Sequence, residues 1–346
     1  MKIKINKKLS ISDKSPPIII AEISGNHSGK KSLFLKHIKS AAKNGADMIK
    51  IQTYEPEDIT LNQRKKKFKI NKGTWKGKFL WDLYKEAHTP FSWHYDAFKL
   101  AKKLNITLFS SPFSKRAVDL LEKLRVPLYK VASFEITDHE LIDYIAKKKK
   151  PIIISTGMAK ISEIKNAVKI IERYHKKIIL LYCVSGYPTK LDDSNISTMQ
   201  TLKKKFKKYL VGISDHTDNI YSSLAASALS ASVIEKHFIL NKKINSLDKG
   251  FSIDASKLSE LKKLSKNIHL SLGKPYIGPK KNEMNSLKLR RSIYAVKEIK
   301  KGEKFTRKNI RSFRPKIGIG AEKFVKILGK IAKKKIAKDS PISQIL

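Results

Sequence analysis

Two histidines stand at the ends of two consecutive apolar runs in this sequence, a placement that suits a metal site. His216 lies in SDHT, after the run at 210–213, and His237 lies in EKHF, after the run at 232–236. If the two runs are neighbouring strands of a closed sheet, both imidazoles can point at one divalent ion. Two nitrogen ligands with open positions suit a Lewis acid that polarises a substrate carbonyl. For either histidine alone, a hydrogen-bonded structural role is the alternative.

Lysines and small polar side chains follow other apolar runs, and together they predict an anion site. Lys50 and Lys130 end the second and fourth runs. A lysine neutralises the charge of a phosphate or carboxylate, while hydroxyl groups donate to its oxygens. The side chains expected beside the lysines are Gln52, Ser111, Ser133, Ser155 and Ser214. At any single position, a solvated lysine or an incidental helix-capping serine is the alternative.

Two carboxylates add candidate acid–base and hydroxyl-binding groups. Glu22 ends the first run, where it can serve as a general base or acid beside a metal. An ion pair with one of the two lysines is the alternative for Glu22. Asp248, in NSLDKGFS after His237, is expected to hydrogen-bond a polyol, or else to shape a turn.

Eight apolar runs, each closed by such a polar cluster, predict the elements that position these groups. Strands are expected at 17–23, 47–52, 106–110, 128–132, 151–155, 178–183, 210–213 and 232–236. Amphipathic stretches between them, such as 32–43 before Gly45 and 161–174, predict helices. Repeated strand–helix units predict a parallel sheet with right-handed crossovers, and eight of them predict closure into a (β/α)8, or TIM, barrel of the α/β class. Reactive groups at the carboxyl ends of the strands are typical of enzymes with that fold.

A change in composition divides the chain. Residues 272–290 include LGKPYIGPKKNE, which is rich in Gly, Pro and Lys and lacks a pattern, as a linker does. We therefore predict a catalytic barrel domain at 1–271 and a small domain of short strands and turns at 291–346. A unit of that length folds alone only marginally, so it is expected to dock on another surface.

The segment 55–95 is longer than an ordinary link between a strand and a helix. It holds all three tryptophans of the chain, Trp75, Trp81 and Trp93. We expect either a lid over the mouth of the barrel or a helical excursion that packs on its side.

The composition limits the partners and the location of the protein. The 346 residues carry a net charge of +44, which is typical of proteins that bind nucleic acid or membrane surfaces. The lysines, however, are spread along the whole chain in runs without interleaved aromatic residues. We therefore favour a general drift of the amino-acid composition toward Lys, Asn and Ile over a binding role as the cause of the charge. No apolar run reaches the roughly 18–20 residues of a membrane span, and no leader segment is recognisable. We expect a cytoplasmic enzyme without nucleic-acid or membrane partners.

The single cysteine, Cys183, is expected to pack in the core, and it excludes a disulfide framework.

Taken in order, the polar clusters resemble those of the sialic acid synthase family. The matching segments are AEISGNHSG, KIQTY, SSPF, YKVASFE, STGM, GISDHT and VIEKHF, followed by RSIYA, IKKGE and RP. The resemblance covers nearly the whole chain, and the ordered set is highly specific. It implies a TIM barrel followed by an antifreeze-like (SAF) domain, in an enzyme that joins phosphoenolpyruvate to a hexose or hexosamine derivative to make a nonulosonic acid.

Within that family, the finer resemblance is to the pseudaminic acid branch. It rests on IKIQTYEPEDITLN, KGTW, LYKEAHTPFSWH, and VIEKHF followed by FSID. The sialic acid branch tends toward a Gly-Ile-Asn-His motif, STPF and YKIGS, where this chain has SGNH, SSPF and YKVAS. The sugar then implied is 2,4-diacetamido-2,4,6-trideoxy-β-L-altropyranose. Synthesis of N-acetylneuraminic or legionaminic acid by the same chemistry is the alternative.

The resemblance also implies roles for individual residues. His216 and His237 match the metal ligands, usually of manganese, although magnesium or cobalt would also suit two histidines. Glu22 matches the acidic residue proposed for proton transfer. The positions that hold phosphoenolpyruvate are Lys50, Ser111, Lys130, Ser133, Ser155, Ser185 and Ser214. The positions on the sugar side are Gln52, Tyr187 and Asp248.

The C-terminal unit resembles the antifreeze-like domain of the family. There it reaches across a domain-swapped homodimer, and its arginine, Arg314 in this chain, contacts the sugar in the partner's active site. A rival of another class, a basic nucleic-acid-binding protein built on a retired barrel, rests on the net charge alone and predicts no metal dependence. The intact set of residues at the strand ends argues against that rival.

Overall fold

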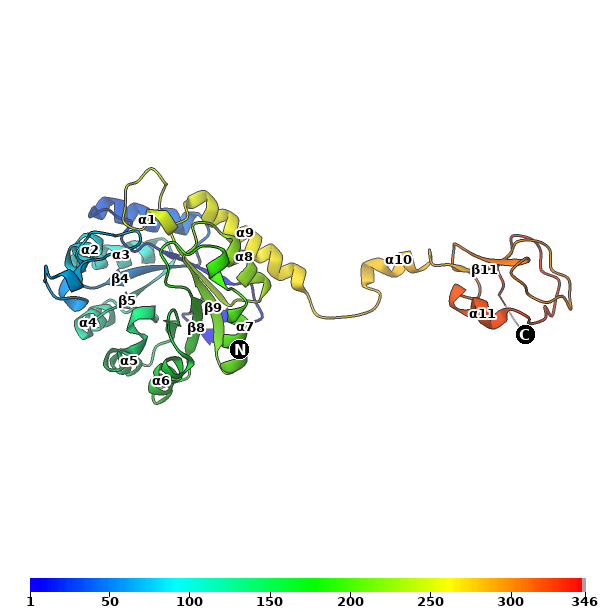
Figure 1. Cartoon of the computed structure of the whole chain (residues 1–346), viewed down its shortest axis with the longest axis horizontal. Coiled ribbons are helices and arrows are strands. Elements are labelled where there is room, and N and C mark those ends of the chain that lie inside the picture. Colours follow the sequence, from blue (N-terminus) through cyan, green and yellow to red (C-terminus); the bar gives the residue numbers. More distant parts are fainter. Residues whose placement is uncertain (344–346) are drawn as a thin grey trace. The chain divides into compact units, whose positions relative to one another are not determined.

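The computed structural model describes residues 1–343 and divides the chain into two compact units, Met1–Gly273 and a second that begins at Lys274. The first unit is a closed barrel of eight parallel strands, so the predicted (β/α)8 barrel is confirmed (Figure 1). The strands are β3 (Ile18–Glu22), β4 (Met48–Thr53), β5 (Thr107–Pro112), β6 (Tyr129–Val131), β7 (Ile152–Ser155), β8 (Ile178–Cys183), β9 (Leu210–Asp215) and β10 (Val233–His237).

Apolar runs that are buried on both faces form the barrel strands. Every residue of β3, β7 and β10 is buried, because helices cover the outside of the sheet and side chains fill its inside. The strand register sets Glu22 beside Lys50 on β4 and beside His237 on β10. It also sets Ser214 beside Glu235. The polar strand ends therefore share one rim of the barrel.

Helices between the strands cover the wall of the barrel (Figure 1). They are α1 (Lys31–Lys43), α2 (Leu80–Ala87), α3 (Phe91–Lys103), α4 (Lys115–Lys123), α5 (His139–Ala146), α6 (Ile161–Glu172), α7 (Thr198–Lys205), α8 (Tyr221–Ala228) and α9 (Ala255–Leu272). The helices predicted at 32–43 and 161–174 are present as α1 and α6. Gly45 follows α1 with a φ of +96°, a conformation that glycine adopts without strain.

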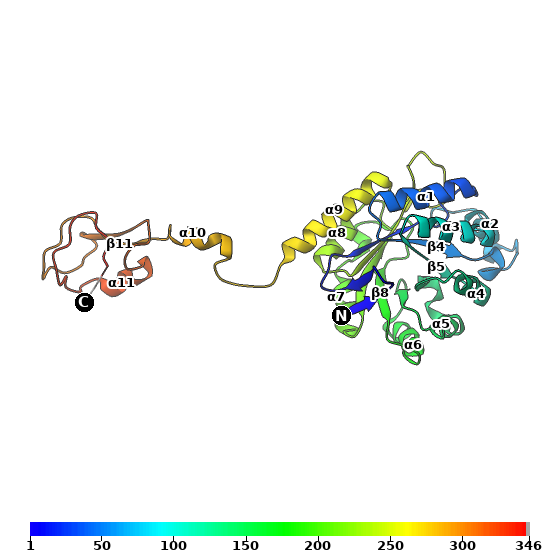
Figure 2. The same cartoon turned by 180° about the vertical axis from the view of Figure 1, so that it is seen from behind.

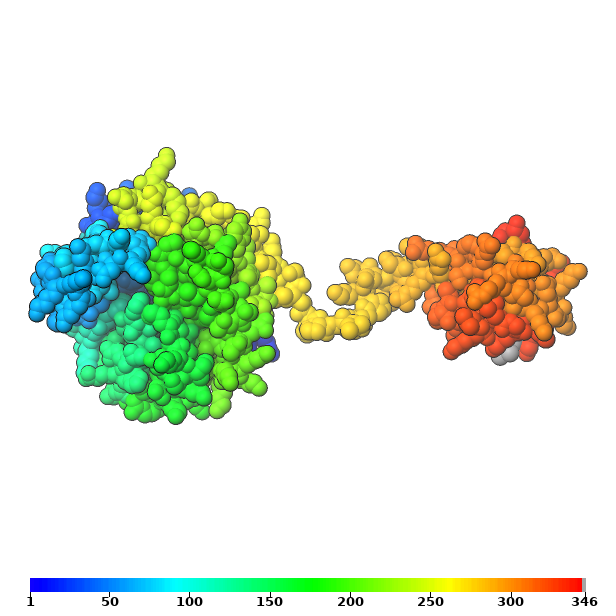
Figure 3. All heavy atoms as spheres, in the orientation of Figure 1, coloured from blue at the N-terminus to red at the C-terminus, as the bar shows by residue number. Residues whose placement is uncertain are grey.

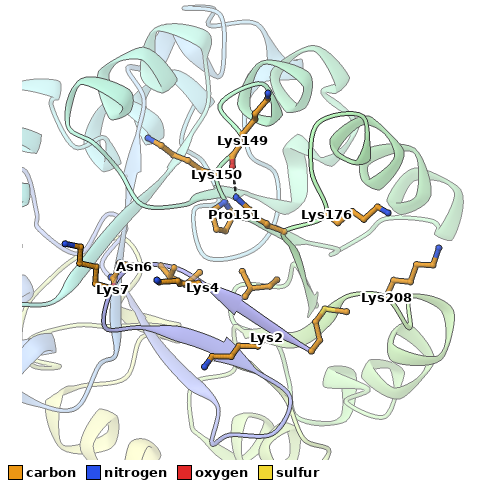
Figure 4. A pocket seen from close by; sticks show the side chains of 13 residues that line it. Lys2, Lys4, Asn6, Lys7, Lys149, Lys150, Pro151, Lys176 and Lys208 are labelled. Atoms are coloured by element: carbon orange, nitrogen blue, oxygen red, sulfur yellow. Dashed lines mark hydrogen bonds between the residues drawn. The ribbon is translucent and has the colours of Figure 1, made fainter.

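An N-terminal hairpin, which no sequence pattern predicted, closes the opposite end of the barrel (Figure 2). β1 (Lys2–Lys4) pairs antiparallel with β2 (Ser10–Ser12), and Ile3 and Ile11 are buried in the barrel core. A cleft of about 860 Å³, lined mostly by lysines, lies between this hairpin and the links that precede β7, β8 and β9. Figure 4 shows the labelled lysine side chains pointing away from one another. The cleft therefore lacks convergent groups for an anion.

The segment 55–95 contains both of the structures expected for it. Residues 59–79, here named the strap, follow a short turn at Pro56–Asp58 and lie over the carboxyl end of the barrel, in light blue in Figure 3. Helices α2 and α3 follow the strap, and α3 packs against α1 on the side of the barrel. On that side the rings of Trp93 and Phe34 lie 5.8 Å apart.

The second unit has a hydrophobic core of its own. β11 (Ser292–Ala295) pairs antiparallel with β12 (Ile310–Phe313), and the short helices are α10 (Met284–Leu287) and α11 (Phe324–Ile327). Its buried core includes Ile293, Phe305, Ile310, Ile327 and Ile342. Across residues 1–343, no helix combines the length and the apolar character needed to cross a membrane.

Candidate active site

Four buried charged side chains lie together inside the barrel at the carboxyl ends of the strands. Glu22, Lys50, Lys130 and Glu235 are each exposed by 4% or less. Lys50 Nζ lies 2.9 Å from Glu22 Oε2 and 3.5 Å from Glu235 Oε1. Lys130 Nζ lies 3.8 Å from the same oxygen of Glu235. The ion pair that was the alternative for Glu22 is therefore present, and it lies at the centre of the candidate site.

Burial and mutual attraction shift the pKa values of these groups. Burial raises the pKa of Glu22 to about 7 against the attraction of Lys50, and nearby Glu235 adds to the increase. Burial lowers the pKa of Lys130, and Glu235 offsets this only in part. Burial also acts to lower the pKa of Lys50, but Glu22 and Glu235 outweigh it and hold that pKa above its usual value. A carboxyl group that exchanges its proton near neutral pH is suited to general acid–base catalysis.

The two histidine rings lie edge to face beside this cluster. Their ring centroids are 5.3 Å apart. His216 Nδ1 lies 2.9 Å from the carbonyl oxygen of Val184, which can only accept, so this Nδ1 carries a proton. His237 Nδ1 lies 3.0 Å from Ser24 Oγ, and Ser24 donates its own proton to Asp248. Nδ1 of His237 therefore also donates, so in the neutral form of either ring Nε2 keeps the lone pair.

This arrangement fits a metal ion with two protein ligands. Burial and the neighbouring His216 hold the pKa of His237 well below its usual value, which favours the neutral, ligating form. Within residues 1–343, no three or more His, Cys, Asp or Glu side chains are grouped so as to hold an ion. Water or substrate would therefore fill the other coordination positions, as in catalytic rather than structural metal sites.

Hydroxyl groups lie beside both buried lysines, as the sequence predicted. Lys130 Nζ donates to Ser155 Oγ at 2.7 Å, and Lys50 Nζ lies 3.4 Å from Ser111 Oγ. Ser214 Oγ donates to Glu235 at 3.0 Å from the neighbouring strand. The lysines and serines therefore form one buried, polar recess.

A second group of hydroxyls surrounds Gly157 at the end of β7. The Gly157 N–H donates to Ser133 Oγ at 3.2 Å. The buried hydroxyl of Ser185 has no hydrogen-bond partner within the described residues. A Cβ placed on Gly157 would lie 2.3 Å from Ser185 Oγ and 2.8 Å from Ser133 Oγ. Only glycine therefore lets both hydroxyls approach the backbone this closely.

The residues expected on the sugar side border the histidines and Glu22. Gln52 Nε2 donates to Glu22 Oε1 at 3.1 Å. Asp248 Oδ2 accepts from the Gly25 N–H at 3.1 Å as well as from Ser24. The ring of Tyr187 lies 4.4 Å from that of His216, centroid to centroid. These three positions thus lie around the same end of the barrel.

Two glutamates were missed by the sequence analysis. Glu235 lies two residues before His237, so the alternation of a strand would have placed both side chains inside the barrel. Glu135 follows β6 in a short turn, Ser133–Thr137, where no periodic signal exists. Burial raises the pKa of Glu135 to about 7 against the attraction of Lys130. Glu135 is therefore a second carboxyl group that can exchange a proton near neutral pH.

Cys183 and Arg314 are the remaining residues for which the sequence led to an expectation. Cys183 is buried, as expected, but it also borders the site, because its Sγ lies 3.7 Å from His216 Nδ1. Arg314 belongs to the second unit, where it follows β12 and is exposed. The other site residues all belong to the first unit.

Comparisons with known proteins agree with the family resemblance found in the sequence. The chain matches the NeuB family over residues 37–276 and the SAF domain over residues 290–344. Pseudaminic acid synthase of Helicobacter pylori is 40% identical over 331 residues, which cover 95% of this chain and 97% of that protein. N,N'-diacetyllegionaminic acid synthase of Campylobacter jejuni is 37% identical and covers 94% of this chain and 99% of its own.

A solved structure extends the similarity to three dimensions. The N-acetylneuraminic acid (sialic acid) synthetase of Leptospira borgpetersenii superimposes with a TM-score of 0.75 at 30% identity. The superposition covers 83% of this chain and 95% of the synthetase.

Proposed function

This chain belongs to the NeuB family and contains a SAF domain, and we propose that it is a pseudaminic acid synthase. The enzyme condenses phosphoenolpyruvate with 2,4-diacetamido-2,4,6-trideoxy-β-L-altropyranose and water, and it releases pseudaminic acid and phosphate. The observation that carries the proposal is the identity to a pseudaminic acid synthase along nearly the whole of both chains. The geometry supports it, because an anion recess, a two-histidine site and a carboxyl group with a pKa near 7 lie together.

We assign phosphoenolpyruvate to the recess beside the lysines. Lys50 and Lys130 hold its phosphate and carboxylate groups, and the surrounding hydroxyls donate to its oxygens. The buried Ser185 hydroxyl, which lacks a partner within residues 1–343, supports this assignment, as does the close approach of the Ser185 and Ser133 hydroxyls to Gly157. The hydroxyls assigned to this subsite are those of Ser111, Ser133, Ser155, Ser185 and Ser214.

His216 and His237 would hold a divalent metal, manganese in this proposal, which when bound supplies Lewis-acid polarisation of the sugar aldehyde. The hydrogen bonds from their Nδ1 atoms to Val184 and Ser24 fix both rings and leave both Nε2 atoms available for the metal. Asp248, which accepts the proton of Ser24, steadies the ring of His237 through that hydroxyl. The same carboxylate is assigned to the sugar side.

The chemistry then depends on orientation and on proton transfers. C3 of phosphoenolpyruvate attacks the aldehyde carbon of the open-chain sugar and forms the new carbon–carbon bond. Water adds to the positive charge that develops at C2, and Glu22 takes a proton from that water. This proton balances the one that the former aldehyde oxygen gains as it becomes a hydroxyl. The tetrahedral C2 expels phosphate by C–O cleavage, its new hydroxyl gives its proton to the departing phosphate, and C2 becomes the keto group of the product.

We also assign a role to the second unit. Arg314 of one protomer contacts the sugar in the barrel of the other, in a domain-swapped homodimer. Two observations support this assignment. The unit has its own core, and its surface carries exposed apolar side chains on both sides of Arg314 in the sequence: Phe313 is 45% exposed and Ile317 is 66% exposed.

Phosphate release from phosphoenolpyruvate in the presence of Mn²⁺ tests the proposal. The purified chain would be given the 2,4-diacetamido-trideoxy-altrose, its legionaminic counterpart, N-acetylmannosamine, or no sugar. Release with the altrose derivative alone supports the proposal. Release only with one of the other sugars would keep the chemistry but move the chain to the legionaminic or sialic acid branch. An absence of release with every sugar, with metal bound, would contradict the function.

A further inference from the structure

Three aromatic side chains from three separate segments pack together beside the histidine pair. Trp75 comes from the strap, Tyr187 from the segment after β8, and Phe251 from the segment after β10. Their ring centroids are 5.6 Å apart for Trp75 and Tyr187, 6.0 Å for Trp75 and Phe251, and 5.1 Å for Tyr187 and Phe251. We name these three residues the aromatic wall.

The aromatic wall is in direct contact with the two imidazoles. The ring of Tyr187 lies 4.4 Å from that of His216, and the ring of Phe251 lies 4.8 Å from that of His237. A sugar whose aldehyde lies near both histidines must therefore place part of its ring or substituents close to this wall.

The strap is fastened to the site at two points. The Thr74 hydroxyl donates to the carbonyl oxygen of Tyr187, and Trp75 Nε1 donates to the carbonyl oxygen of Leu247 at 3.1 Å. The second bond satisfies the one polar atom of the Trp75 side chain, so its remaining surface is apolar. Trp75 is half-buried, whereas Phe251 is 1% exposed. Tyr187 is half-buried as well, so Trp75 and Tyr187 are the two members of the wall with surface that a ligand can cover.

Two of the polar groups near the wall already have hydrogen-bond partners within the chain. Asp248 accepts from Ser24 and Gly25, and the amide of Gln52 donates to Glu22. A substituent hydroxyl placed against the wall would lose hydrogen bonds to water without full replacement, whereas a methyl group would gain from burial. Such a surface favours deoxygenated and N-acylated sugars over hydroxylated ones.

We propose that Trp75, with Tyr187 and Phe251, determines sugar specificity by packing against apolar substituents, namely the C6 methyl and the 4-acetamido methyl. This inference rests on the proposed function, because it assumes a 2,4-diacetamido-2,4,6-trideoxy sugar. Trp75 is a specificity-determining residue and takes no part in proton transfer. The strap delivers it to the site from the far side of the barrel mouth.

The test compares three sugars with the wild-type chain and with Trp75→Ala. The sugars are the proposed substrate, its 6-hydroxy analogue and its analogue with a 4-hydroxyl in place of the 4-acetamido group. We expect Trp75→Ala to lower kcat/KM for the proposed substrate by about 10–100-fold, mainly through a higher sugar KM, as is typical for apolar contacts of this size. We expect kcat/KM for at least one hydroxylated analogue to fall much less in this variant. The KM for phosphoenolpyruvate should change by less than about 2-fold.

Two control variants separate packing from folding. Trp75→Phe keeps a ring but loses the N–H that donates to Leu247, and it should retain most of the preference for the proposed substrate. Trp81→Ala removes another half-buried tryptophan, at the start of α2 and outside the wall, and should leave the preference among sugars unchanged.

Each other outcome would overturn the inference in an identifiable way. An equal fall of kcat/KM for all three sugars in Trp75→Ala would mean that the strap has only a structural role. Unchanged kinetics in that variant would remove Trp75 from sugar binding while leaving the proposed function intact. A wild-type chain that releases no phosphate with any of these sugars would contradict the proposed function, and the inference with it.

Discussion

Glu22 has an environment that keeps its carboxyl group partly ionised near neutral pH. Burial raises its pKa to about 7, and Lys50 at 2.9 Å opposes that increase. The form that can accept a proton from water is therefore the major one above pH 7 and is lost as the pH falls. The same raised pKa favours the fold most below the ordinary value of 4.5, and this contribution fades as the pH rises toward 7.

We expect kcat/KM to fall below about pH 7 in the wild-type chain, because the ionised carboxylate is the base. In Glu22→Gln, turnover should fall by about 10²–10⁴-fold, and the acidic limb of the pH profile, which is the fall of kcat/KM below about pH 7, should disappear. Binding of manganese and phosphoenolpyruvate, measured by calorimetry, should persist. Glu135→Gln is the matched comparison, since that carboxyl group also has a pKa of about 7. A limb that persists in Glu22→Gln but vanishes in Glu135→Gln would assign the base to Glu135 instead.

Gly157 offers a test of the phosphate recess that adds only one methyl group. In Gly157→Ala the new Cβ would stand 2.3 Å from Ser185 Oγ and 2.8 Å from Ser133 Oγ, so both hydroxyls must move. We expect KM for phosphoenolpyruvate to rise by about 10-fold or more, while KM for the sugar stays within about 3-fold. Gly250→Ala is the control, because a Cβ there would meet nothing within 4 Å. Equal effects on both KM values would show that the recess does not serve phosphoenolpyruvate.

Strand alternation explains which site residues could be predicted from the sequence. Glu22, Lys50 and His237 each end an apolar run, and the parallel register brings them side by side. Glu135 and Trp75 could not be found in this way, because they lie on irregular segments that only the folded chain brings to the barrel mouth. Local pattern carries no information on such contacts between distant segments.

At the scale of elements, the barrel was predictable and its N-terminal hairpin was not. Eight repeated strand–helix units have few ways to bury their apolar faces, so closure follows from the pattern. The two hairpin strands have three residues each, too few for a periodic signal, and their pairing depends on the barrel base that covers Ile3 and Ile11.

A buried ion pair behind the histidines links the two strands that carry them. Lys236 Nζ lies 3.2 Å from Asp215 Oδ1 and donates to the Thr217 carbonyl oxygen at 2.5 Å, with Lys236 fully buried. We expect Lys236→Met to lower the free energy of unfolding by about 3–5 kcal/mol, because Asp215 is left buried without its cation. Denaturant unfolding measures this loss. The double variant Lys236→Met, Asp215→Asn should recover part of it, and no recovery would mean that the pair does not act as a unit.

At the scale of the whole molecule, the assignment of Arg314 predicts that two defective chains can repair each other. Arg314→Ala should raise the sugar KM and leave that for phosphoenolpyruvate nearly unchanged. If one protomer completes the barrel of the other, mixing Arg314→Ala with Glu22→Gln creates a hybrid dimer with one intact site. We expect activity to return on mixing, after subunit exchange and measured as phosphate release. A mixture no more active than the sum of its parts would mean that each chain completes its own site or needs no second unit.

Two lysines stand against two glutamates at the centre of the barrel, so the charges there cancel when both carboxylates are ionised. Phosphoenolpyruvate would bring about three negative charges into that space at neutral pH, which favours the protonated form of any carboxyl group nearby. Glu22 can take up a proton when the anion binds, because its pKa is already about 7. Binding should then draw protons from the buffer, and its heat should vary with the buffer's ionisation enthalpy. Affinity for the anion would improve in mild acid, over the same range in which the base needed for turnover is lost.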